Sequence, residues 1–244
     1  MSGKRSGIIY IVIGTIILCG AFTAYWNTQT ASSKHIITIL IDPGHGGDDP
    51  GKIGINGELE KDINLSISRK LAACLKANGY HVVMSRETDC MLSDPQVPNK
   101  KTSDLSRRVQ MMQESEADFV ISIHQNSYPD NSIHGAQCFY YAGSDTGQEL
   151  AGILQAALIS LADPDNRRQA KSNDSYYIMK NSTCPVIIVE CGFLSNADEA
   201  LLLSDDQYQE KLALAITTGI NQYVQTQSLY DRKIIFQHSH IIIS

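Results

Sequence analysis

Four side chains that can bind a metal ion or move a proton lie at the boundaries of apolar segments. His45 lies in a Pro/Gly-rich turn (42–47) after one apolar run, and His124 ends another. Glu60 opens a long helical pattern, and Glu190 ends a third apolar run. Two histidines and one carboxylate can hold a catalytic zinc ion and leave a position for water, while a second carboxylate can serve as the base. These residue types predict a zinc hydrolase with one zinc ion per chain.

Glu60 and His124 each have an alternative interpretation on the residues alone. Glu60 stands beside two more acids, Glu58 and Asp62, and an acid in the first turn of a helix is favourable without any metal. His124 follows β-branched residues, so a buried histidine with purely structural hydrogen bonds is the competing interpretation. Asn126 shares the strand face of His124 by the period of two, which makes it a candidate for orienting substrate or a ligand.

Glu190 is the most unusual of the four residues. It directly follows four apolar residues, and a carboxylate in such a place costs several kcal/mol if it is buried without a partner. The rim of a sheet suits it better, because there it can face a metal ion with its water and accept a proton. The alternative is a structural salt bridge to Arg86 or Arg108.

Strand and helix patterns alternate along residues 35–225, which predicts a single α/β domain with a twisted, largely parallel or mixed sheet flanked by helices. The helix that opens at Glu60 is expected to stop at Asn78-Gly79, and the next helix is expected to start with Asp104 as its cap. Such folds place their sites outside the carboxyl ends of strands. The expected strands are 36–41, 80–84, 119–124, 135–141 and 186–190, and the other expected helices are 104–116, 145–162, 197–203 and 205–225.

The beginning of the chain predicts attachment to a membrane or export across it. Residues 7–25 are almost entirely apolar, and Lys4 and Arg5 precede them. Their length suits a membrane-spanning helix or a long signal-peptide core, and the positive charges favour a cytoplasmic N-terminus. Residues 1–26 are therefore expected to act as an anchor or signal segment and the polar residues 27–34 as a linker, which places the catalytic domain outside the cytoplasm.

Charge and cysteine content narrow the class further. The chain carries a net charge of −6, and the part beyond residue 30 carries −8. A domain this acidic is a poor general binder of DNA or anionic lipid, and no nucleic-acid partner is expected. Five cysteines follow the first segment, and because an odd number is unlike a disulfide framework they are expected to be mostly buried and free. Residues 226–244 form a tail to which no role is assigned.

Four motifs in a fixed order add a resemblance to these physical signals. The motifs are Asp42-Pro43-Gly44-His45-Gly46-Gly47, Glu60 followed by Asn64-Leu65, Ser122-Ile123-His124-Gln125-Asn126, and Val189-Glu190-Cys191-Gly192-Phe193-Leu194-Ser195-Asn196. Together, over about residues 36–224, they resemble the zinc-dependent N-acetylmuramoyl-L-alanine amidases. Gln125 departs from that family's pattern, in which a small residue usually follows the histidine, and it is expected to narrow the groove.

The resemblance implies a role for each candidate residue. In that family the matching residues bind zinc, which assigns His45, Glu60 and His124 as ligands and selects Glu60 over its acidic neighbours. The matching catalytic base is Glu190. Asn126 and Arg108 are lesser candidates, either for orienting substrate or for supporting the fold. The implied reaction is hydrolysis of the amide between N-acetylmuramic acid and L-alanine in peptidoglycan.

The arrangement of one membrane segment, a linker, a catalytic domain and no wall-binding repeats resembles the germination-specific branch of that family. This branch acts on spore cortex, where peptide removal prepares muramic acid for conversion to the δ-lactam. The expected location is extracytoplasmic, in the forespore or cortex compartment, with peptidoglycan strands as substrate; an accessory protein partner is left open.

Two other functions compete with an amidase. A zinc carboxypeptidase acting on peptidoglycan peptides would need a cation for the free carboxylate, which Arg86 or Arg108 could supply. A catalytically weak wall-binding module would be expected to have lost one of the four candidate residues, and all four are present.

Overall fold

A computed structural model describes residues 35–241, with side chains described through residue 229. The expected anchor or signal segment (1–26) and the expected linker (27–34) lie outside the described residues. Within the described part of the chain, no helix is long and apolar enough to cross a membrane.

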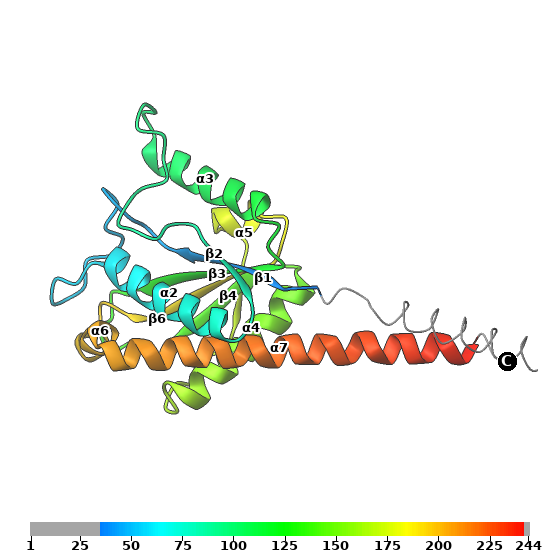
Figure 1. Ribbon diagram of the computed structural model, residues 1–244. Helices are drawn as coiled ribbons and strands as arrows, with labels where there is room; N and C mark the ends of the chain where they lie inside the picture. The colour runs from blue at the N-terminus through cyan, green and yellow to red at the C-terminus, as the bar shows by residue number, and fades with distance from the viewer. Residues whose placement is uncertain (1–34, 242–244) are drawn as a thin grey trace, which may run out of the picture. The chain divides into compact units, whose positions relative to one another are not determined.

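A six-stranded sheet forms the centre of the domain (Figure 1), with the strand order β2-β1-β3-β6-β4-β5. Neighbouring strands run parallel except β4 and β6, which pair antiparallel. The sheet is therefore mixed, which is one of the two predicted arrangements. The strands are β1 (Thr38–Pro43), β2 (His81–Met84), β3 (Phe119–Asn126), β4 (Gln137–Tyr141), β5 (Lys171–Asn173) and β6 (Val186–Phe193).

Helices cover both faces of this sheet (Figure 1), as predicted for an α/β domain. Leu40 of β1 packs in a cluster with α3 and α5, whereas its neighbours Ile39 and Ile41 pack with α2, α4, α6 and α7 on the opposite face. All three side chains are 0% exposed, so the alternation of the strand supplies two cores at once. The helices are α2 (Glu60–Ala77), α3 (Lys100–Glu114), α4 (Asp145–Leu161), α5 (Tyr177–Asn181), α6 (Ala197–Ser204) and α7 (Asp206–Ile241).

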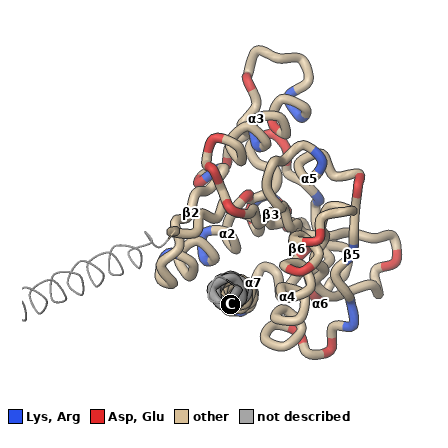
Figure 2. The backbone as a smooth tube through the Cα atoms, turned by 90° about the vertical axis from the view of Figure 1, so that its right-hand side faces the viewer, with Lys and Arg blue, Asp and Glu red and all other residues tan. Residues whose placement is uncertain are grey.

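The helix α7 lies between α2 and α4, as the view along its axis in Figure 2 shows. On the α2 side, Ser66 donates to Gln209 at 2.6 Å, where the acceptor is Oε1. On the α4 side, Gly219 approaches Leu154 so closely that a Cβ on the glycine would lie 2.9 Å from Leu154 Cδ2. This packing buries α2 against the sheet and fixes the position of its first residue, Glu60.

The start of α3 differs from the prediction. The helix begins at Lys100, and the side chain of Asn99 caps it by accepting from the Thr102 backbone N–H at 3.1 Å. The prediction of Asp104 as the cap was therefore wrong. Asp104 lies one turn inside the helix and forms an ion pair with Arg108 at 2.6 Å. This ion pair compensates for the burial of the carboxylate.

Three further findings concern the remaining elements. The elements β5 and α5 lie in a polar stretch that was expected to be a loop, and at three and five residues they are too short to show a period. The helix α7 continues to Ile241, past its predicted end near residue 225, so the tail is helical as far as it is described. The five cysteines that the structure describes are all free, as predicted, but the expectation that most of them would be buried was wrong, because only Cys138 and Cys191 are buried whereas Cys74, Cys90 and Cys184 are partly exposed.

Candidate metal centre and active site

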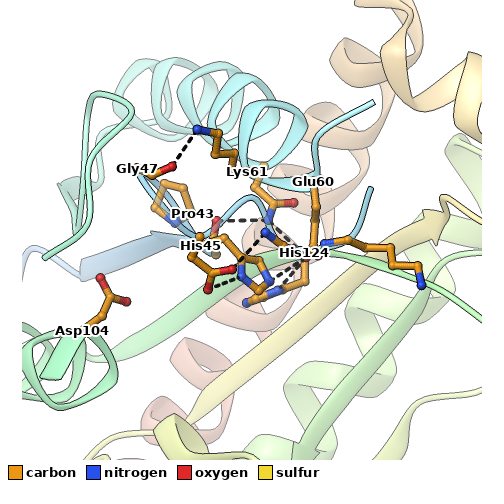
Figure 3. A network of polar contacts seen from close by, with 12 residues as sticks. Pro43, His45, Gly47, Glu60, Lys61, Asp104 and His124 are labelled. Atoms are coloured by element: carbon orange, nitrogen blue, oxygen red, sulfur yellow. Dashed lines mark hydrogen bonds and ion pairs between the residues drawn. The ribbon is translucent and has the colours of Figure 1, made fainter. Parts of the chain in front are cut away.

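Three candidate ligands converge at the carboxyl edge of the sheet (Figure 3). His45 follows β1, Glu60 is the first residue of α2, and His124 belongs to β3. Their ligand atoms all lie within 4.8 Å of one another. Glu60 Oε1 is 3.2 Å from His45 Nε2 and 2.9 Å from His124 Nδ1. Two imidazole nitrogens and one carboxylate fit the donor set of a catalytic zinc site.

The turn after β1 presents His45 in a backbone conformation that side chains rarely adopt. The φ angle of His45 is 61°, in the left-handed region, so the surrounding structure must hold it there. Arg108 Nη2 donates to the His45 carbonyl at 2.7 Å, and Arg86 Nη2 donates to the Gly44 carbonyl at 3.0 Å. Gly44 can only be glycine, because a Cβ there would lie 2.2 Å from the ring of His124.

The imidazole of His45 is oriented by carboxylates on both sides. Its Nδ1 lies 2.9 Å from Asp49 Oδ2, which leaves Nε2 directed at Glu60. A carboxylate on the far nitrogen of a histidine is the usual way in which a metal ligand is fixed and made more basic. Burial alone would lower the pKa of His45, but its contacts with Glu60 and Asp49 raise that pKa above the ordinary value.

Glu60 is held by donors from three parts of the chain. Its Oε2 accepts from the Lys52 backbone N–H at 2.7 Å, and its Oε1 accepts from the Gln125 backbone N–H at 3.1 Å. Burial would raise the pKa of Glu60, but hydrogen bonds from His124 and His45 lower it far below its ordinary value. The residue is thus a charged carboxylate in a buried place, which suits a cation.

The neighbouring acids take no part in this cluster. Glu58 accepts from the backbone N–H and the side-chain amide of Asn56 at 3.1 and 2.9 Å, and Asp62 is exposed. The structure therefore brings Glu60 to the two histidines and leaves Glu58 and Asp62 outside, a choice that residue type alone had left open.

Glu190 lies on β6 directly opposite His124 in the parallel pairing with β3. It is 7% exposed, and no salt bridge to Arg86 or Arg108 is found among the described residues. Its Oε1 accepts from the Tyr176 hydroxyl at 3.4 Å, while its Oε2 is buried without a hydrogen-bond partner in the described chain. One oxygen is thus left for a proton or a water molecule.

The surroundings of Glu190 make it a stronger base than an ordinary glutamate. Burial is the main cause that raises the pKa of Glu190 to about 7, and the charge of Glu60 acts in the same direction while that of His124 opposes it. A bound cation would lower this pKa, because an opposite charge favours the ionised form. A carboxyl group with a pKa near neutrality can both accept and release a proton at physiological pH.

The two lesser candidates occupy different environments. Arg108 is 2% exposed, and its guanidinium donates to Asp42, Asp104 and two backbone carbonyls. This engagement favours support of the fold over contact with substrate. Asn126 is half-buried at the end of β3, where its Oδ1 accepts from the Ser127 backbone N–H at 2.8 Å.

The prediction for Gln125 was wrong, and Tyr176 was not singled out from the sequence. Gln125 was expected to narrow the groove, but it is 4% exposed and its amide donates to Asn64 Oδ1 at 3.1 Å, beneath the site. That prediction is wrong because Gln125 lies on the opposite strand face from His124. Tyr176, beside Glu190, comes from the polar stretch that showed no periodic signal.

An open groove of about 440 Å³ lies beside Glu60, one of the candidate metal ligands. Lys52, whose backbone N–H binds Glu60, lines it together with the loops that follow β3 and β6. Three of its lining side chains are large, apolar and about half exposed, namely Ile53, Ile55 and Tyr128. A groove of this kind beside the candidate site suits a large substrate that has both polar and apolar groups.

Comparison with known proteins gives a consistent result. The family model described as N-acetylmuramoyl-L-alanine amidase matches residues 39–222. The germination-specific N-acetylmuramoyl-L-alanine amidase of Bacillus subtilis is 38% identical over 188 residues, which is 76% of this chain and 78% of the relative.

Solved structures agree with the family match. The CwlD amidase of Clostridioides difficile, solved in complex with the GerS lipoprotein, is 37% identical and has a TM-score of 0.76 over 78% of this chain and 99% of the other. The N-acetylmuramoyl-L-alanine amidase AmiC2 of Nostoc punctiforme is 31% identical, with a TM-score of 0.68 over 78% and 97%. The chain belongs to the N-acetylmuramoyl-L-alanine amidase family, and it is an amidase of peptidoglycan.

Proposed function

We propose that this amidase is a zinc enzyme in which His45, Glu60 and His124 bind the ion and Glu190 is the general base. The observation that carries the proposal is the convergence of the three ligand atoms within 4.8 Å of one another. When bound, zinc lowers the pKa of a water molecule to about 7 and polarises a carbonyl oxygen. Glu190 lies opposite His124 in the sheet, and one of its oxygens has no hydrogen-bond partner among the described residues.

In the proposed reaction the Glu190 side chain carries one proton from the attacking water to the nitrogen of the leaving L-alanine. The attacking water gives one proton to Glu190 Oε2 while the water oxygen forms a bond to the lactyl carbonyl carbon of the muramic acid. Glu190 then delivers this proton to the nitrogen of L-alanine as the C–N bond breaks, so that a carboxylic acid and a free amine result. Tyr176 stabilises the orientation of Glu190 by donating to its other oxygen at 3.4 Å.

The carboxypeptidase alternative is less well supported. Such an enzyme needs a free cation for the terminal carboxylate of its substrate, and both arginines offered for that role are buried. Arg86 donates to the carbonyls of Pro43, Gly44, Lys61 and Thr88, and Arg108 is paired with Asp42 and Asp104. Neither guanidinium is available to a ligand.

We also propose that the enzyme acts in spore cortex, where it removes peptides before δ-lactam formation. The similarity to a germination-specific amidase supports this role, and the neighbour solved with a lipoprotein supports an accessory partner of that kind. Residues 1–26 would anchor or export the domain, with 27–34 as linker, to an extracytoplasmic place. Spores of a strain that lacks the gene for this protein should have a cortex without muramic δ-lactam. A normal δ-lactam content in these spores would contradict the cortex role.

The reaction is tested by digesting purified peptidoglycan and analysing the products by mass spectrometry. We expect peptide-free muramic acid and stem peptides with a free N-terminal L-alanine. The Glu190→Gln variant cannot accept the proton, so its turnover should fall by a factor on the order of 10² to 10⁴ while zinc and fold persist. Trimmed peptides would instead indicate a carboxypeptidase, and near-normal turnover of the variant would exclude Glu190 as the base.

Metal content tests the ligand assignment. We expect about one zinc ion per chain, and a large loss of zinc in His45→Ala and in His124→Ala, because each substitution removes one of three protein ligands. His81→Ala is the matched control, since His81 is exposed on β2 and should be dispensable for zinc binding. Full zinc occupancy in both ligand variants, measured by elemental analysis, would refute the assignment.

The raised pKa of Glu190 predicts a pH-dependent effect on the stability of the metal-free protein. Below a pH of about 4.5 Glu190 is protonated in both the folded and the unfolded chain, so Glu190→Gln should change little. As pH rises to about 7 only the unfolded chain loses the proton, which destabilises the wild type. Above that pH the variant should be more stable by on the order of 3 kcal/mol.

Denaturant titrations at several pH values, with a chelator present, measure this difference. Glu210→Gln is the matched control because it removes one exposed glutamate from α7. Its effect on the free energy of unfolding should stay small across the same range. A difference between Glu190→Gln and wild type that does not grow between pH 4.5 and 7 would show that Glu190 is not destabilised by burial.

A further inference from the structure

We propose that Gln125 and Asn64 form an amide relay that sets the mutual position of the three zinc ligands and thereby strengthens zinc binding. The inference rests on the proposed zinc site and adds two positioning residues to it. Neither residue would touch the ion or the substrate.

The relay is a continuous path of hydrogen bonds beneath the cluster. Gln125 Nε2 donates to Asn64 Oδ1 at 3.1 Å. Asn64 Nδ2 in turn donates to the Gly44 carbonyl at 3.1 Å and to Glu60 Oε1 at 3.3 Å. Asn64 is 0% exposed and Gln125 is 4% exposed, so water does not compete for these bonds.

The three residues that these hydrogen bonds connect each lie close in the sequence to a different proposed zinc ligand. Gly44 precedes His45, Gln125 follows His124, and Asn64 lies one helical turn after Glu60. The two amides thus join β1, β3 and α2 at the points from which the three ligands project. Fixing these three points fixes the triangle of donor atoms.

The direction of the first hydrogen bond matters for the second. An asparagine side chain can present either its oxygen or its NH₂ group to a neighbour. Because Gln125 donates to Asn64 Oδ1, the Asn64 NH₂ group must point the other way, towards Gly44 and Glu60. Gln125 therefore acts on the metal ligand through Asn64.

Packing alone does not account for the glutamine. Gln125 Oε1 is buried and accepts no geometrically well-formed hydrogen bond in the described chain, although the side chain lies close enough to the Cys191 thiol to interact with it. A buried acceptor without a partner is destabilising, and an apolar side chain of similar size would avoid that cost. The position is thus occupied by a residue whose donor makes a well-formed hydrogen bond to Asn64 and whose acceptor has at most a weak thiol contact, which is the pattern expected if the donor serves the site.

The test replaces each amide by an apolar side chain of similar size in the full-length protein and measures zinc affinity by competition with a chelator. We expect Gln125→Met and Asn64→Leu each to raise the zinc Kd by about 10- to 100-fold, the range seen when partners of metal ligands are removed. With zinc in large excess, turnover of Gln125→Met should recover towards that of the wild type.

Gln155→Met is the matched control for loss of a buried glutamine. Gln155 is also 4% exposed, and its amide binds the Cys138 N–H at 2.9 Å and the Ala136 carbonyl at 3.0 Å, away from the zinc ligands. This variant should lower the unfolding temperature and leave the zinc Kd unchanged. It separates a general loss of stability from a specific loss of zinc affinity.

A double variant decides whether the two amides act in series. If Gln125 works through Asn64, adding Gln125→Met to Asn64→Leu should change the zinc Kd by less than twofold. Additive effects, or a Gln125→Met variant with the wild-type Kd, would overturn the relay. If Gln125→Met does not fold, Gln125→Leu is measured in its place. A wild-type protein that binds no zinc would refute the proposed function itself, an outcome distinct from failure of the relay.

Discussion

The buried ion pair between Arg108 and Asp42 is the interaction on which the presentation of the site depends. The two side chains are 2% and 1% exposed, and loss of either would leave an uncompensated charge in the interior, typically at a cost of about 3–5 kcal/mol. The same guanidinium donates to the carbonyls of Pro43 and His45. Arg108 therefore connects β1 to the backbone of His45, which has a left-handed conformation. This hydrogen bond offsets part of the strain in the turn.

Two buried glutamates at the site have opposite properties because their neighbours differ. Glu60 accepts hydrogen bonds from backbone and histidine donors, which hold its pKa far below the ordinary value despite burial. Glu190 has one long hydrogen bond from Tyr176, so burial dominates and raises its pKa to about 7. A carboxylate that stays charged and a carboxyl group that can exchange a proton thus lie at the same candidate site, on α2 and on β6. Separation of two carboxyl groups by environment is a recurrent way of assigning them different roles.

The sequence predicted those parts of the structure that follow from strand and helix periods. His45, His124 and Glu190 were located because each follows a long apolar run, and the carboxyl ends of such strands meet at one edge of the sheet. Tyr176 lies next to a helix of five residues, too short to show a period. The orientation of Gln125 could not be read from the family pattern, because it depends on a partner on α2 that only the packed structure supplies.

The contacts of His45 have a consequence for how the ion and protons compete. Both ring nitrogens face carboxylates, Nδ1 towards Asp49 at 2.9 Å and Nε2 towards Glu60 at 3.2 Å. This arrangement favours an imidazolium that carries a proton on each nitrogen. If the proposed zinc ion binds His45 through Nε2, it would displace the proton there, so loading of the site would release acid. Acidity of the surroundings would then oppose occupancy of the proposed site.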